Sequence, residues 1–93
     1  MIGNEIGRKL DERSRMLAQQ AEINALERGA SGRPVAWSNP DNGRRGEIVP
    51  GAAYRRSGSD CRDYVHTVTI DGRQETLRGS ACRNSDGTWR QMS

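Results

Sequence analysis

The sequence predicts an α+β fold in which one N-terminal helix precedes a four- to five-stranded antiparallel β meander with one cross-strand disulfide. Three observations support this. A helical period stops near residue 30, turn signals recur from Pro34 onward, and one predicted hairpin places the two cysteines opposite each other. We accordingly expect two parts, an N-terminal helix over residues 1–30 and a disulfide-stapled β domain over residues 31–93.

The helical pattern covers residues 4–28, which we expect to form a single helix. Gly29, followed by a Pro-containing stretch that ends at Pro34, predicts its end. If the sheet leaves the stronger apolar stripe uncovered, the helix would mediate homo-oligomerisation. That stripe consists of Ile6, Leu10, Leu17 and Ala21, and a weaker one consists of Met16, Ile23 and Leu26.

Short strand-like runs separated by Gly, Pro, Asn and Asp fill the rest of the chain. Turn signals this frequent favour an antiparallel meander over a βαβ unit. The predicted strands lie at 35–39, 46–50, 52–56, 61–70, 73–83 and 88–92.

The geometry of the last long hairpin places the two cysteines opposite each other. Asp71-Gly72 between two strand-like runs predicts a type I′ turn, because Asp and Gly tolerate the positive φ that this turn requires. The turn places Cys61 opposite Cys82 at a non-hydrogen-bonded site, where Cα atoms approach to about 4.5 Å and a disulfide can form. The alternatives are two buried free thiols or half of a metal site, although one His and no C-x-x-C spacing disfavour metal. A disulfide at this position predicts export to an oxidising compartment.

The same register also predicts the two faces of the hairpin. We expect one face to be core, with Tyr64 covering Gly79, and the other to be solvated. The core face carries Tyr64, His66, Val68, Ile70, Leu77 and Ala81, and the solvent face carries Asp63, Thr67, Thr69, Gln74, Thr76, Arg78 and Ser80.

The composition is poor in core-forming residues and rich in Arg. Hydrophobic types total 32%, Phe is absent, and the net charge is +3. Residues 1–30 are neutral, so the excess lies in residues 31–93, where ten Arg face seven acids. A solvated surface explains this pattern. The alternative is contact with an anionic polymer such as lipopolysaccharide or peptidoglycan, whereas an oxidising compartment argues against nucleic acid.

No residue pattern indicates catalysis, a cofactor or a metal site. His66 is the single histidine, and its place on the core face favours a structural role over a catalytic one. The four aromatic residues, Trp37, Tyr54, Tyr64 and Trp89, are expected in the core. In the alternative, Trp37 or Trp89 is exposed in a binding patch formed with Arg44, Arg45, Arg55 and Arg56.

Four motifs occur in order along the chain: W-x-N-P at 37–40, C-R-x-Y at 61–64, A-C-R at 81–83 and D-G-x-W at 86–89. Residues 2–13 resemble the end of a glycine-zipper segment that runs into a following helix. Together these features resemble the C-terminal domain of the rickettsial seventeen-kilodalton surface antigen family, outer-membrane lipoproteins of α-proteobacteria. The resemblance extends over nearly the whole chain.

The resemblance implies a non-enzymatic surface-antigen domain with a structural or protein-binding role at the outer membrane, facing the periplasm or the cell surface. It also implies a signal sequence and a lipidated cysteine ahead of the domain. Neither is seen here, so we expect Met1 to begin a piece of a longer exported protein. Envelope proteins, including the outer-membrane assembly machinery, are the expected partners. Inhibition of a hydrolase is a further alternative.

Overall fold

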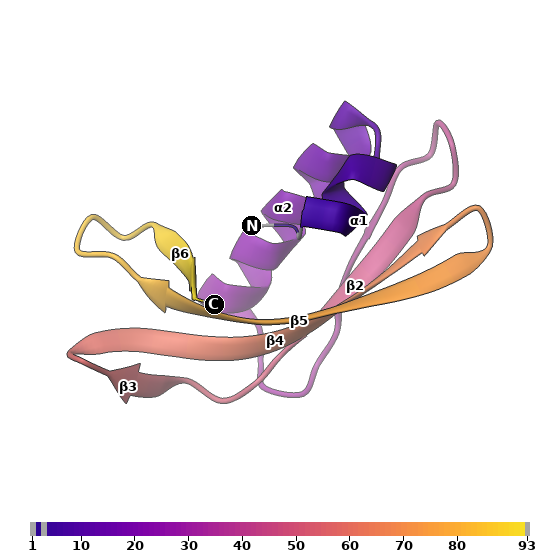
Figure 1. The fold of residues 1–93 in the computed structure, drawn as a ribbon. Helices are drawn as coiled ribbons and strands as arrows, with labels where there is room; N and C mark the ends of the chain where they lie inside the picture. Colours follow the sequence, from indigo (N-terminus) through magenta and orange to yellow (C-terminus); the bar gives the residue numbers. More distant parts are fainter. Residues whose placement is uncertain (1, 3, 93) are drawn as a thin grey trace.

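The computed structural model describes residues 2 and 4–92, and it has the predicted α+β architecture. Two helices precede six strands (Figure 1). Each strand corresponds to one of the six strand-like runs of the sequence, although the meander was expected to hold only four or five strands. The elements are α1 (Asn4–Lys9), α2 (Glu12–Arg28), β1 (Val35–Ser38), β2 (Arg45–Pro50), β3 (Tyr54–Arg56), β4 (Ser59–Ile70), β5 (Arg73–Arg83) and β6 (Trp89–Met92).

All strand pairs are antiparallel, in the order β1-β2-β4-β5-β6. The additional strand β3 pairs with the start of β4, beyond the segment of β4 that pairs with β2. Pro50 ends β2 because proline has no N–H for the ladder, and Gly51 then donates to the Asp63 carbonyl. The two short strands β2 and β3 therefore follow one side of β4 in succession.

The β4–β5 hairpin has the predicted register. Asp71 and Gly72 both have positive φ, 50° and 77°, as a type I′ turn requires. Ten residue pairs follow without a bulge, and the last of them is Cys61 opposite Cys82. Their Cα atoms lie 4.0 Å apart and their sulfurs are bonded, so the predicted disulfide is confirmed.

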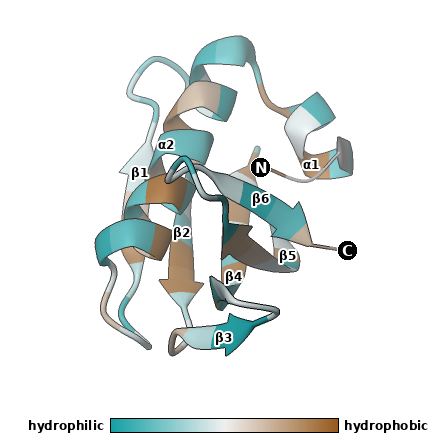
Figure 2. Cartoon of the chain, turned by 90° about the vertical axis from the view of Figure 1, so that its left-hand side faces the viewer, coloured by the Kyte–Doolittle hydropathy of each residue, from teal (hydrophilic) through white to brown (hydrophobic). Residues whose placement is uncertain are grey.

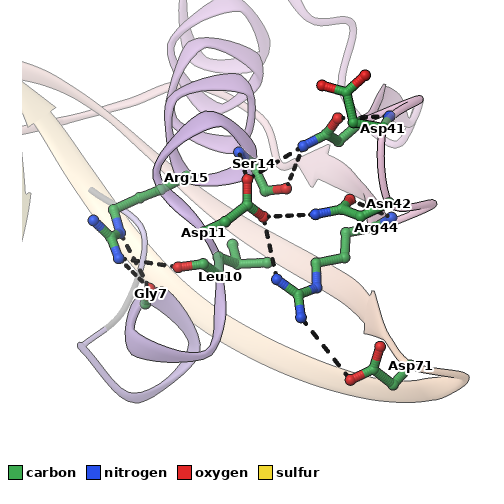
Figure 3. Close-up of polar contacts among 10 residues, drawn as sticks. Gly7, Leu10, Asp11, Ser14, Arg15, Asp41, Asn42, Arg44 and Asp71 are labelled. Carbon is green, nitrogen blue, oxygen red and sulfur yellow. Dashed lines mark hydrogen bonds and ion pairs between the residues drawn. The ribbon is translucent and has the colours of Figure 1, made fainter.

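The prediction of a single helix over residues 4–28 is wrong. The helix is broken at Leu10 and Asp11, because Asp11 adopts an extended conformation and caps α2 by accepting a hydrogen bond from the Ser14 N–H at 3.2 Å. Arg15 holds the two helices together, since its guanidinium donates to the carbonyls of Gly7 and Leu10 (Figure 3). Gly3, which belongs to the segment that resembles the end of a glycine zipper, lies outside the described residues.

Both helices lie on the same side of the sheet, where the core forms (Figures 1 and 2). Small side chains on α2 allow its backbone to approach the strands, and Ala18 and Ala25 are completely buried. The predicted core face of the β4–β5 hairpin is confirmed, with Leu77 only partly buried. Tyr54 is an exception to the expected aromatic core, because it lies at the sheet edge on β3 and remains 36% exposed.

The sheet covers the stronger apolar stripe of the helical segment. Ile6, Leu10 and Ala21 are buried and Leu17 is partly buried, which removes the condition on which helix-mediated self-association was expected. The weaker stripe is divided, since Leu26 enters the core while Met16 and Ile23 remain exposed.

Candidate functional site

His66 belongs to a buried hydrogen-bond network that joins α2, β1 and β4. The Trp37 indole N–H donates to His66 Nε2 at 2.8 Å, and His66 Nδ1 lies 2.7 Å from a Glu22 carboxylate oxygen. Because Nε2 accepts from the indole, the ring proton must lie on Nδ1, which then donates to Glu22. Glu22 and His66 have no exposed surface, so both His66 nitrogens serve the fold.

Tyr64 lies next to this network on the same face of β4. Its ring covers Gly79, where a Cβ atom would come within 2.8 Å of the ring. Its hydroxyl and one Glu22 oxygen are buried without a hydrogen-bond partner among the described residues. Burial, and then the charge of Glu22, raise the pKa of Tyr64 well above its usual range.

Asn39 of the W-x-N-P motif attaches the β1–β2 loop to the start of α2. Its buried side-chain amide donates to the hydroxyl of Ser14 at 2.9 Å and to the carboxylate of Asp11 at 3.3 Å. Its side-chain oxygen accepts from the Asp41 N–H. Figure 3 shows Asp11 at the centre of this cluster, also bound by Asn42 and Arg44.

Arg62 of the C-R-x-Y motif caps the other end of α2. It is only 8% exposed, and its guanidinium donates to the carbonyls of Ala25 and Leu26 at 3.1 and 3.2 Å. It also binds the Gly51 carbonyl at the bend between β2 and β3. A cation at a helix C-terminus interacts favourably with the last carbonyls. The Ala25 carbonyl also accepts from the Gly29 N–H, so Arg62 provides a second donor there.

The last two motifs meet at the end of the sheet under α2. Trp89 donates to a Glu27 carboxylate oxygen at 2.8 Å, and Arg83 contacts both Glu27 and the Trp89 ring. Asp86 shapes the preceding turn by accepting hydrogen bonds from Thr88, which lower the pKa of Asp86. Each of the four motifs therefore contributes at least one residue that holds the helix on the sheet or shapes a turn.

The residues of the predicted binding patch do not form one cluster. Trp37 is buried and Trp89 is partly buried, both on the helix side of the sheet. Arg44 pairs with Asp11 and Asp71, and Arg55 pairs with Asp60. By register, Arg45 and Arg56 share the other face of the sheet.

That other face, which we call the open face, is the side of the sheet that the helices do not cover. By alternation from the register, its side chains include three threonines, which form a polar strip with Ser38 and Gln74. A shallow groove of about 500 Å³ runs along this strip. The groove is lined by Ala36, Ser38, Arg45, Glu47, Thr67, Thr69 and Gln74 of the open face, and also by Trp37 and Gly46, whose register positions face the helix side.

The open face is also where sequence reasoning was incomplete. Arg78 and Arg90 were not included in the predicted patch, although the register places both on this face, Arg78 opposite Val65 and Arg90 beside Cys82. Alternation along β5 was the available signal for Arg78. Among the described residues, no group of three or more His, Cys, Asp and Glu side chains is arranged to hold a metal ion.

A protein-family model described as 17 kDa outer membrane surface antigen matches residues 24–90, from the second half of α2 to β6. The chain belongs to this family. The resemblance noted in the sequence is thereby confirmed, and family membership supports a location in the cell envelope or at its surface. No described helix has the length and apolar character that crossing a membrane requires.

Several curated rickettsial relatives of this surface antigen family are similar over most of the chain. The 17 kDa surface antigen of Rickettsia bellii strain RML369-C is 45% identical over 87 residues, which is 92% of this chain and 55% of the relative. That of Rickettsia felis is 47% identical over 81 residues, 86% of this chain and 51% of the relative. The chain thus spans about half the length of these relatives. No solved structure matches the chain.

Proposed function

We propose that this surface-antigen domain has a non-enzymatic, structural or protein-binding role at the outer membrane, and that its open face is the surface that contacts its partners. The observation that supports this proposal is that the reactive side chains of the domain are engaged within the fold. Both His66 nitrogens are hydrogen-bonded in the core, and both cysteines are joined in a disulfide. What the sheet presents outward is a broad array of hydroxyl, amide and guanidinium groups, which suits binding.

The finer location belongs to the same proposal. The family resemblance implies a lipid anchor and a glycine-zipper segment ahead of the domain in the whole protein. The domain would then stand in the periplasm or on the cell surface, close to the outer membrane. Envelope proteins, including the outer-membrane assembly machinery, are the partners proposed for it.

Site-specific photo-crosslinking tests which surface makes contact. A photoreactive amino acid replaces Thr76, exposed on the open face, or Gln20, exposed on α2, in the full-length protein in its native envelope. We expect crosslinked products from Thr76 in clear excess over those from Gln20. Equal yields at both positions, or none at Thr76, would contradict the proposed role of the open face.

A further inference from the structure

We propose that the open face also binds peptidoglycan, whose stem-peptide carboxylates would be held by a row of arginines and whose sugars would be held by the polar groups between them. This inference rests on the proposed function, which makes the open face the contact surface. It is carried by the charge of that face, by the spacing of its arginines and by the polar groups between them.

The open face carries most of the net positive charge of the molecule. By register it has four arginines against two carboxylates, which accounts for two of the three net charges of the chain. Asp63 is engaged by Ser80 and Tyr54, whose hydrogen bonds lower its pKa. The four arginines are Arg45, Arg56, Arg78 and Arg90.

None of these four arginines forms an ion pair with a described residue, and each ion pair found in residues 2 and 4–92 lies elsewhere. Arg90 donates to the carbonyl of Arg83 and to the side-chain oxygen of Asn84. Both acceptors are neutral, so the positive charge of Arg90 is not compensated. Arg45, Arg56 and Arg78 are exposed. Guanidinium groups in this state bind carboxylates in a bidentate manner.

Three of the four arginines are regularly spaced along the sheet. Arg45 lies beside Thr69, Arg78 beside Val65, and Arg90 is connected through Cys82 to Cys61. These three β4 positions are four residues apart, which corresponds to steps of about 13 Å along the strand. Separated single charges suit a polymer whose carboxylates recur along its length, as those on the stem peptides of peptidoglycan do. A lipid headgroup with clustered phosphates would require clustered arginines instead.

The groups between the arginines suit a sugar chain. Thr67, Thr69 and Gln74 line the groove, and they can exchange hydrogen bonds with sugar hydroxyls and acetamido groups. A second hollow shares Arg45, Thr69 and Gln74 with the groove and continues to the Asp71-Gly72 turn. The polar strip is therefore continuous with the arginine row, as an extended ligand requires.

Co-sedimentation with purified peptidoglycan sacculi tests the inference. The protein is compared with Arg45→Gln/Arg78→Gln and with Arg8→Gln/Arg28→Gln, a matched control that removes two exposed helix charges that form no ion pair with any described residue. Loss of two exposed charged contacts should weaken binding about tenfold in the first variant and less than about twofold in the control. Binding should also decline between about 0.05 and 0.5 M salt.

Three results would overturn the inference: no binding to sacculi, equal losses in both variants, or binding to heparin or lipopolysaccharide as tight as to sacculi. Circular dichroism and thiol titration confirm beforehand that the variants are folded and disulfide-bonded. The two proposals can fail separately. Crosslinks from Thr76 to a protein, without binding to sacculi, would leave the proposed contact surface in place and remove peptidoglycan as its partner.

Discussion

The hydrogen bond from Trp37 decides the state of His66. An indole nitrogen can only donate, so it fixes His66 Nε2 as an acceptor and leaves the ring proton on Nδ1, facing Glu22. A buried network of this kind specifies how α2, β1 and β4 come together, because each polar atom left without its partner carries a desolvation cost.

Replacing Trp37 with Phe should destabilise the domain by about 2 kcal/mol, since His66 Nε2 would remain buried without a donor. Urea denaturation measures this free energy. Trp89→Phe is the matched control, because the bond from Trp89 to Glu27 is exposed and its loss should cost less than about 1 kcal/mol. Equal losses in the two variants would contradict the structural importance of the buried network.

Gly79 is required by the position of the Tyr64 ring. A Cβ atom at this position would lie 2.8 Å from the ring, too close for carbon atoms in van der Waals contact. Gly79→Ala should therefore lower the free energy of unfolding by about 1–3 kcal/mol. The substitution Thr76→Ala, on an exposed site of the same strand, should change it by less than about 0.5 kcal/mol. A Gly79→Ala protein as stable as the original would refute this packing argument.

At the scale of elements, the two ends of α2 are each held by a side chain that is distant in sequence, together with the adjacent cap Asp11 at the N-terminus. Asp11 and Asn39 secure its N-terminus, and Arg62 secures its C-terminus. Helix ends have backbone groups without intrahelical partners, so these contacts fix the helix axially on the sheet. Both ends of the helix therefore depend on residues of the sheet and of its β1–β2 loop.

Arg62→Met retains most of the side-chain volume but removes the donors to three carbonyls, so we expect a loss of about 2–4 kcal/mol in stability. Thermal unfolding would show a clear decrease in Tm. Arg73→Met removes an exposed arginine and should leave Tm nearly unchanged. Similar Tm values for both variants would show that Arg62 does not hold the helix end.

Asp11 makes stability depend on acid pH. Hydrogen bonding to Ser14, and then to Asn42 and Arg44, holds the pKa of Asp11 well below its usual range. Its contribution is fully present above the ordinary pKa of Asp, near 4, and is lost as pH falls further through the depressed folded value. Asp11→Asn retains the cap but does not titrate, so its stability should depend less on pH between about 4 and 2.

Acid titration of stability by fluorescence compares the original protein with Asp11→Asn. Asp60→Asn, which changes an exposed carboxylate at the β3–β4 turn, serves as the control and should retain the original pH profile. Parallel pH profiles for the original protein and Asp11→Asn would show that this carboxylate does not link stability to pH.

At the scale of the whole molecule, a small core is stabilised by one covalent bond. The disulfide lies, by register, on the side of the sheet opposite to α2, yet both cysteines are buried between the strands that flank them. It joins β4 and β5 at the end of the hairpin that is farthest from the turn. The disulfide therefore fixes the open end of the β4–β5 hairpin, which the core by itself holds only in part.

Replacing both cysteines with Ala should lower the free energy of unfolding by about 3 kcal/mol, because the closed loop no longer restricts the unfolded chain. The same loss should appear when the original protein is unfolded in urea with a reductant. A reductant should have no effect on the double variant. An unchanged midpoint for the original protein in reductant would contradict this role of the disulfide.

The sequence by itself determined the β4–β5 hairpin, its register, its disulfide and its core face. Asp71-Gly72 defines the turn locally, and strand alternation then extends that information over ten residue pairs. The family resemblance was likewise legible, because its motifs are short, ordered and spread along the chain.

Only the tertiary structure decided the break at Asp11, the burial of Glu22 and the pairing of each arginine. These depend on contacts between residues far apart in the chain, such as Glu22 with His66 and Asp11 with Arg44, which no local pattern encodes. The helical period continues through Leu10 and Asp11, so the pattern alone could not reveal the cap. For the same reason the sequence shows how many arginines the chain has, but not how they are arranged. Their row on the open face follows only from the pairing of β2, β4, β5 and β6.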